Sequence, residues 1–232
     1  MLLGLLCGYP MGARISSELY ANHSISKNEC QYLLSFSCNA SPAFLLNYLA
    51  WGCLDGQIPA KLIFLPLLLA DLLCMLVFRI LLRPGRYRNE KSPLDTRAKK
   101  ETPSILSPGE ILDISIMNGL ETITRLGGYL LLFSILNAAL SHFWVFSRKT
   151  LYLFSGVMEL TTGLHSLSQS TLSLEQKYLF SMVMVSFGGI CVLSQTRSCL
   201  DPSLSMRTYL IAKLLNTGLT LLFSLYFLKF IL

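Results

Sequence analysis

Cys38-Asn39-Ala40-Ser41-Pro42 is the stretch of sequence that decides the fold. It lies inside an uncharged segment of 24 residues, 30–53, and a span across a bilayer needs about 20 residues. Pro42 lacks a backbone donor and disfavours helical geometry at Ser41, so the pattern predicts that the helix breaks here. Such a break at the midplane is typical of a transporter binding site. The alternative is a proline kink in an ordinary spanning helix.

The composition predicts a membrane protein. Of the 232 residues, 53% are hydrophobic and 14% are charged, and several uncharged runs are 17 to 24 residues long. The net charge of +6 does not indicate nucleic-acid binding, because seven basic residues fall within 83–100, beside a predicted span. In that position they predict a cytoplasmic loop. The first seven residues lack the basic region and cleavage site of a signal peptide.

The side chains predict no enzyme. The seven cysteines lack a metal-ligand spacing and are expected to be reduced. The sequence has no phosphate-binding loop and no serine–histidine–acid arrangement. We therefore expect no cofactor, no metal and no catalytic residue.

The second half of the chain repeats the pattern of the first. Ser26 and Ser173 each begin a capping-box pattern, which predicts a helix start. Ser41, in the first break, comes 15 residues after Ser26, and Gly188 comes 15 residues after Ser173. Gly188 thus marks a second predicted break. The match is one of pattern and not of identity, so a chance alignment of helix-start signals is the alternative.

These signals predict an all-α polytopic membrane protein that contains an inverted repeat. Each repeat comprises a re-entrant hairpin, a broken helix and a spanning helix. We expect the first repeat at 1–82, a basic cytoplasmic loop at 83–107, and the second repeat within 108–232. Segment 111–125 is amphipathic and is expected along the membrane interface, and 127–143 is expected to span the membrane.

Three motifs carry a resemblance to a known family. They are Gly8-Tyr9-Pro10-Met11-Gly12-Ala13, Cys38-Asn39-Ala40-Ser41-Pro42-Ala43-Phe44 and Phe187-Gly188-Gly189-Ile190-Cys191-Val192. They resemble the motifs of the YlbJ-type sporulation integral membrane proteins. These belong to the nucleoside-recognition gate group, which is similar to the core of concentrative nucleoside transporters.

The resemblance implies an integral protein of the cell membrane or the forespore membrane of a spore-former. It also implies a part in moving dipicolinate, a small aromatic dicarboxylate, through a site between facing re-entrant hairpins. A different class of function stays open, namely a structural or regulatory component of a spore-formation complex that does not transport. A fragment of a nucleoside-type transporter is a further alternative.

The predicted site lies where the breaks and the hairpins meet. Broken helices present free backbone donors and the positive ends of half-helix dipoles, which suit an anion. The candidate substrate-binding residues are Gly8, Pro10, Gly12, Asn39, Ser41, Pro42, Glu159, Thr162, Gly163, Gly188, Gly189 and Gln195.

The charged residues within the apolar segments have different expected roles. Glu159 would repel an anionic solute, so we expect it to couple or gate transport; the alternative is a solvated carboxylate near the surface. Asp71 lies near the centre of a span and is expected to pair with its neighbours. Lys213 is expected near one end of the last span. Asn39 is expected to face a cavity and to take little part in packing.

The expected partners are a small-molecule solute and membrane lipid, and the pattern leaves room for a coupling ion. The first hairpin arm, 1–7, would reach roughly 10 Å as helix, whereas half of a hydrocarbon core is about 15 Å. Members of the resembled family are also longer. We therefore expect that a longer chain or a second polypeptide supplies further helices, and that these 232 residues alone show no flux.

Overall fold

The computed structural model describes residues 2–82, 107–145 and 147–229, and every regular element among them is a helix. The all-α prediction is therefore confirmed, while the predicted basic loop, apart from Ser107, lies outside the described residues. The elements are α1 (Leu2–Cys7), α2 (Met11–Ala21), α3 (Lys27–Ser37), η1 (Phe44–Cys53), α4 (Ala60–Leu82), α5 (Pro108–His142), α6 (Arg148–Met158), α7 (Leu160–Ser168), α8 (Leu174–Phe187), α9 (Gly189–Cys199) and α10 (Met206–Leu228).

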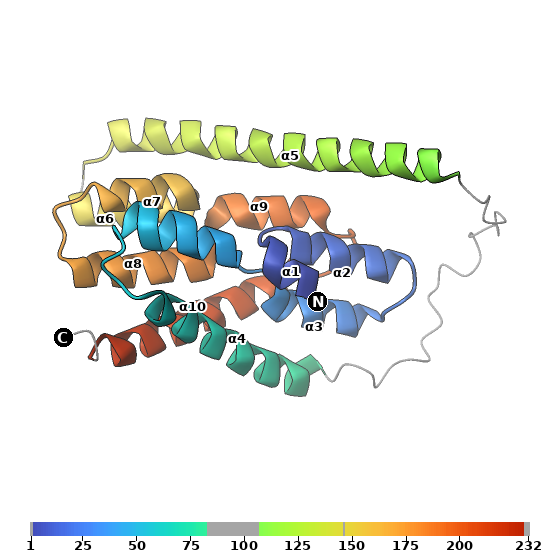
Figure 1. Ribbon diagram of the computed structural model, residues 1–232, viewed down its shortest axis with the longest axis horizontal. Helices are drawn as coiled ribbons and strands as arrows, with labels where there is room; N and C mark the ends of the chain where they lie inside the picture. The colour runs from blue at the N-terminus through green and yellow to red at the C-terminus, as the bar shows by residue number, and fades with distance from the viewer. Residues whose placement is uncertain (1, 83–106, 146, 230–232) are drawn as a thin grey trace.

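The helices lie roughly along one direction, with α5 on one side and the crossing pair α4 and α10 on the other (Figure 1). The short helices α1, α2, α6 and α7 lie between these two layers with the broken helices. The pair α6–α7 lies toward one end of the molecule and the pair α1–α2 toward the other (Figure 1). Helix α4 ends at the end where α5 begins, whereas α10 ends at the opposite end (Figure 1).

The first predicted break is present. Ser26 and Glu29 form the expected capping box and start α3, with Glu29 N donating to Ser26 Oγ at 3.3 Å and Ser26 N to Glu29 Oε2 at 2.8 Å. The helix stops before Cys38 and helical structure resumes beyond Pro42. Ser41 Oγ accepts a 3.2 Å hydrogen bond from Phe44 N and so caps the second half. That half, η1, is a π-helix.

The second predicted break is also present, and glycine makes it possible. Gly188 and Gly189 separate α8 from α9 with φ of +84° and +82°, a region that side-chain-bearing residues rarely adopt. A Cβ on Gly189 would lie 3.0 Å from Gly156 O, so the close approach of α6 also requires glycine there. At the start of α8, Ser173 Oγ accepts from Gln176 N at 3.4 Å, which is half of the expected capping box.

The hairpins differ from the expectation in one detail. The sequence predicts a tight turn over 8–13, but the turn is confined to Gly8, Tyr9 and Pro10, and Gly12 already lies inside α2. Gly12 packs directly on the carbonyl of Ser37, so a Cβ at this position would overlap that oxygen. The small residue thus lets α2 approach α3 closely.

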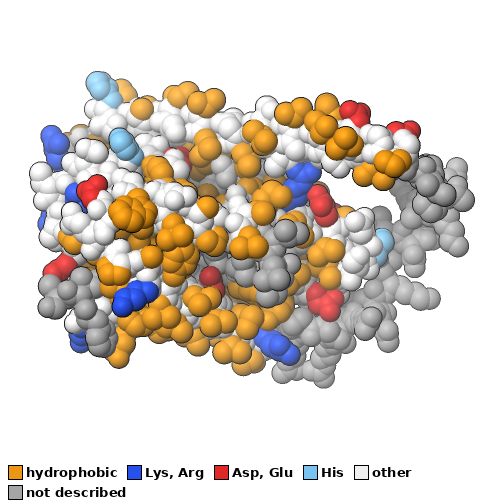
Figure 2. Space-filling model, in the orientation of Figure 1, with side chains coloured by type: hydrophobic (Ala, Val, Ile, Leu, Met, Phe, Trp, Pro, Cys, Tyr) orange, Lys and Arg blue, Asp and Glu red, His pale blue; other side chains and the backbone are white. Residues whose placement is uncertain are grey.

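Four segments are long and apolar enough to cross a membrane, namely Ala60–Leu82, Pro108–His142, Leu174–Cys199 and Met206–Leu228. Large apolar side chains are exposed on α4, α5 and α10, and Figure 2 shows them along α5 and over the opposite side of the molecule. These surfaces suit contact with lipid chains.

Helix α5 is continuous for 35 residues, so 111–125 and 127–143 are not separate elements as the sequence analysis expects. The glycines at 127 and 128 do not interrupt it, because a helix tolerates isolated glycines at a modest cost. Only Phe133 and Asn137 of α5 are buried.

Candidate functional site

Lys213 lies at the centre of a buried polar network that joins four elements. Its side chain belongs to α10 and is only 3% exposed. Nζ donates to Asn39 Oδ1 at 2.6 Å, to Tyr9 OH at 3.1 Å and to Ser186 O at 3.4 Å. The network thus unites the first hairpin turn, the first break, the end of α8 and the last span. The expectation that Lys213 lies near a membrane surface is wrong.

Asn39 links Lys213 to a carboxylate. Its Nδ2 donates to Asp71 Oδ1 at 2.7 Å and to Phe36 O at 2.9 Å, while its Oδ1 accepts from Lys213. The amide can lie only this way round, because an ammonium has no acceptor and a carboxylate has no donor. Among the described residues, Lys213 and Asp71 do not form a direct ion pair. Asn39 therefore separates two opposite charges and bonds to both.

Asp71 lies at the midpoint of α4, and its Oδ1 also accepts from Asn216 Nδ2 at 2.6 Å. The predicted pairing of Asp71 with neighbouring side chains is confirmed. Its partners are amides and not cations, so the nearby Lys213 charge is left without a directly bonded counter-ion. A buried charge without one interacts strongly with any anion that reaches it, because the surrounding dielectric constant is low.

Tyr9, at the tip of the first hairpin, connects this site to the second break. Its hydroxyl donates to Val185 O at 3.0 Å, and its ring lies under Lys213 with Nζ 4.6 Å from the ring centroid. A Cβ on Gly188 would lie 3.2 Å from the same ring. The break at Gly188 therefore leaves room for the aromatic side chain that orients the ammonium group.

The buried face of α10 is polar for most of its length. Tyr209, Lys213, Asn216, Thr220 and Ser224 recur at helical spacing, and each is at most 3% exposed. The outward face carries exposed leucines and isoleucine, so α10 is polar toward the protein and apolar toward the membrane. A membrane helix with such an inward face is expected at a polar path or a polar interface.

The predicted site residues fall into two groups and two outliers. Gly8, Asn39, Ser41, Pro42 and Gly188 surround the Lys213 network or the turn beside it; a Cβ on Gly8 would lie 3.0 Å from Ser41. The second group, at the tip of the second hairpin, comprises Glu159, Thr162, Gly163 and Gly189. Pro10 and Gly12 lie at the start of α2, and Gln195 is buried in α9, where Nε2 donates to Cys191 Sγ at 3.4 Å.

Glu159 is 1% exposed, so the alternative of a solvated surface carboxylate is wrong. Its carboxylate caps α7: Oε1 accepts from Thr161 N at 2.9 Å, and Oε2 accepts from Thr162 N and Thr162 Oγ1, both at 2.6 Å. Thr161 Oγ1 also lies within 2.9 Å of both oxygens. These donors stabilise the negative charge and fix the hairpin tip.

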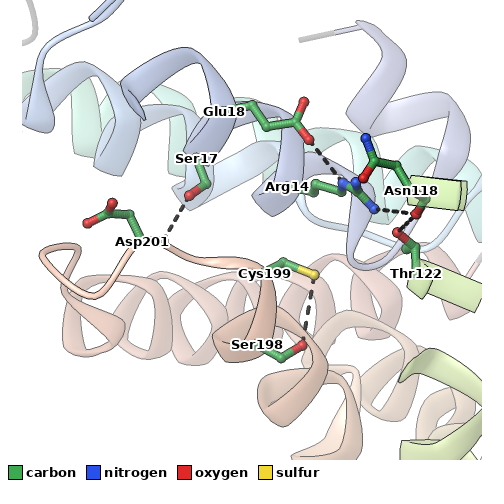
Figure 3. A network of polar contacts seen from close by, with 8 residues as sticks. All are labelled: Arg14, Ser17, Glu18, Asn118, Thr122, Ser198, Cys199 and Asp201. Atoms are coloured by element: carbon green, nitrogen blue, oxygen red, sulfur yellow. Dashed lines mark hydrogen bonds and ion pairs between the residues drawn. The ribbon is translucent and has the colours of Figure 1, made fainter. Parts of the chain in front are cut away.

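A cavity of about 240 Å³ lies away from the Lys213 network, between α2, α5 and α9. Figure 3 shows polar groups around it: Arg14 bonds to Glu18 on its own helix and donates to Asn118 O of α5 at 3.3 Å. Ser198 and Cys199, at the end of α9, also line this space. In the structure, the midplane groups therefore pair with one another, and the open space lies nearer the end of the molecule where α5 begins.

The sequence analysis missed Tyr9 and Lys213 as members of the central network. The spacing of Tyr209, Lys213, Asn216 and Thr220 on one face of an otherwise apolar span could have identified Lys213. Tyr9 lies inside the motif that was recognised, but an aromatic side chain in a turn has several equally plausible roles.

The fold and this buried network define an integral, polytopic all-α membrane protein. Within that class the chain is similar to the sporulation integral membrane protein YlbJ of Bacillus subtilis strain 168, with 25% identity over 249 aligned residues. The alignment covers 93% of this chain and 60% of YlbJ, so the chain spans about three fifths of its curated relative. The resemblance predicted from the motifs is thus confirmed. No family model and no solved structure matches the chain.

Proposed function

We propose that this chain contributes the solute site of a sporulation membrane transporter, and that Lys213 receives a small anionic solute at the midplane. The observation that carries the proposal is the burial of this ammonium group, 3% exposed, among neutral hydrogen-bond partners. A buried ion in the membrane is costly, and such residues commonly mark transport paths.

The neutral partners of Lys213 are replaceable. Asn39 Oδ1 and Tyr9 OH each accept one hydrogen bond from Nζ, and a carboxylate oxygen accepts the same bond more strongly because it is charged. A solute carboxylate that displaces Asn39 would also neutralise the ammonium. A cationic solute would gain nothing from this arrangement.

The packing of the helices supports an inverted repeat. Helix α2 of the first hairpin contacts α9, the second half of the second broken helix, and α7 of the second hairpin contacts η1, the second half of the first. Helices α3 and α8 likewise pack on α4 and α10, which contact each other. Reciprocal contacts of this kind are what two halves of opposite orientation produce. In this arrangement Glu159 holds the second hairpin and does not touch the solute.

The proposed solute is dipicolinate or a similar dianion. The motif resemblance implies dipicolinate, and the name of the B. subtilis relative places that protein in sporulation. Dipicolinate bears a carboxylate at each end of a flat ring, so one carboxylate could pair with Lys213.

Uptake of radiolabelled dipicolinate into membrane vesicles tests the proposal. Vesicles with the wild-type chain, expressed with any helices that complete it, are compared with vesicles that carry Lys213→Met. Lys229→Met, at the exposed end of α10, is the matched control. We expect Lys213→Met to abolish uptake and Lys229→Met to leave it unchanged. Equal uptake by all three proteins would contradict the role of Lys213, and no uptake by any would favour the structural, non-transporting alternative.

A further inference from the structure

Two buried hydroxyl groups near Lys213 have no hydrogen-bond partner among the described residues. They are Tyr209 OH on α10 and Thr196 Oγ1 on α9, in side chains that are 1% and 0% exposed. Buried hydroxyls in folded proteins nearly always have a partner, so an unpaired pair side by side calls for an explanation. Neither helix needs these hydroxyls for its own backbone hydrogen bonds.

Both hydroxyls lie on the cavity side of Lys213. Tyr209 is one helical turn before Lys213 on the polar face of α10, and Lys213 Nζ lies 5.9 Å from the centre of its ring. The hydroxyls of Tyr209 and Thr196 lie close to each other and to the Cys38 thiol. Thr196 is one turn deeper along α9 than Cys199, which lines the 240 Å³ cavity. The two hydroxyls therefore lie between that cavity and the ammonium group.

The chemistry of these groups selects an acceptor. A tyrosine hydroxyl and a threonine hydroxyl can each donate one hydrogen bond, and Lys213 contributes a positive charge beside them. A group that satisfies both hydroxyls and suits the charge must carry acceptor oxygens and negative charge. A carboxylate has two such oxygens, each of which can accept more than one hydrogen bond.

We propose that Tyr209 and Thr196 are further solute-binding residues, whose hydroxyls donate to a carboxylate that enters from the cavity and pairs with Lys213. This inference rests on the proposed function, because it assigns additional groups to the same site. It also places the entry side of the site at the end of the molecule where α9 ends and α5 begins.

Tyr209→Phe and Thr196→Val test the proposal, because each removes a hydroxyl and keeps most of the side-chain volume. Ser224→Ala is the matched control, since Ser224 is a fully buried hydroxyl without a partner on the same face of α10, about 22 Å further along the helix. The affinity of each purified full chain for dipicolinate is measured by isothermal titration. We expect each of the first two variants to weaken binding by about tenfold or more, and Ser224→Ala to leave it unchanged.

The melting temperature without solute provides a second readout. A hydroxyl that serves the fold would be missed on removal, whereas a hydroxyl without a partner would not. We therefore expect Tyr209→Phe and Thr196→Val to melt at or above the wild-type temperature, and dipicolinate to raise their melting temperatures less than it raises that of the wild type. A drop in melting temperature in the absence of solute would contradict the inference.

Lys213→Met separates the two claims. If it abolishes binding while both hydroxyl variants bind as tightly as the wild type, the proposed function stands and the inference about Tyr209 and Thr196 is wrong. If Lys213→Met binds dipicolinate normally, or the wild type does not bind it at all, the proposed function itself fails and the inference with it.

Discussion

Replacing Asn39 by leucine should destabilise the protein strongly, because this amide joins two buried charges. The substitution removes a 2.6 Å bond from Lys213, a 2.7 Å bond to Asp71 and a 2.9 Å bond to Phe36 O. Hydrogen bonds to charged groups contribute about 1.5–3 kcal/mol each. Since the contributions are not fully additive, we expect a loss of about 3–5 kcal/mol in the free energy of unfolding. The sequence-based expectation that Asn39 takes little part in packing is thus wrong.

Asn137→Leu is the matched control. Asn137 is also buried, at 2% exposed, but its only hydrogen bond in the described structure is a 3.2 Å bond to Ser155 O, and its Oδ1 has no partner there. Losing one neutral hydrogen bond costs about 1 kcal/mol, and removing an unpaired acceptor offsets part of that cost. The two substitutions have the same chemistry and differ in the charge of the partners.

Thermal unfolding followed with a thiol-reactive dye compares the two variants. Cys30, Cys38, Cys53, Cys74 and Cys191 are buried, so the dye reports their exposure on unfolding. We expect the melting temperature of Asn39→Leu to fall by several times as much as that of Asn137→Leu. Equal losses would refute the reasoning, because Asn39 would then not stabilise the charges beside it.

Three further predictions concern the break, the second hairpin and the topology. Gly188→Ala should cost about 1–2 kcal/mol for its left-handed backbone and impair uptake by displacing Tyr9, whereas Gly218→Ala, with nothing within 4 Å, should be neutral; equal uptake by both would contradict this. Glu159→Gln should lower stability by about 2 kcal/mol, because an amide nitrogen would face the donors that cap α7; an unchanged melting temperature would exclude that role. Reporter fusions at Arg88 and Leu232 should show opposite sides of the membrane, and the same side for both would disprove the topology.

The breaks could be predicted from the sequence because local residues determine them. Pro42 excludes a continuous helix whatever surrounds it, and Ser26 caps α3 through bonds to a residue three positions away. Gly188 adopts a left-handed conformation that few other residues tolerate. For the same reason the helical elements agree closely with the expected segments, apart from α5, where a change in polarity near Arg125 did not end the helix.

The centre of the candidate site could not be predicted in the same way, because it depends on contacts between distant residues. Lys213 and Asn39 are 174 positions apart, and Tyr9 and Val185 are 176 positions apart. Nothing local to Lys213 shows that α10 turns it toward a hairpin tip. Glu159 was found as an intramembrane carboxylate, but its use as a helix cap depends on the two threonines that follow it and on the exact end of α6.

The most direct test of the central claim measures the distance between Lys213 and the solute in a bilayer. Solid-state NMR can detect the dipolar coupling between lysine ζ-nitrogens labelled with ¹⁵N and the carboxylate carbons of ¹³C-dipicolinate bound to the reconstituted protein. We expect one lysine signal to be strongly dephased, at a nitrogen–carbon separation of about 3–4 Å as in an ion pair, and that dephasing to be absent in Lys213→Met. Bound dipicolinate that dephases no lysine signal, or that still dephases one in Lys213→Met, would contradict the account.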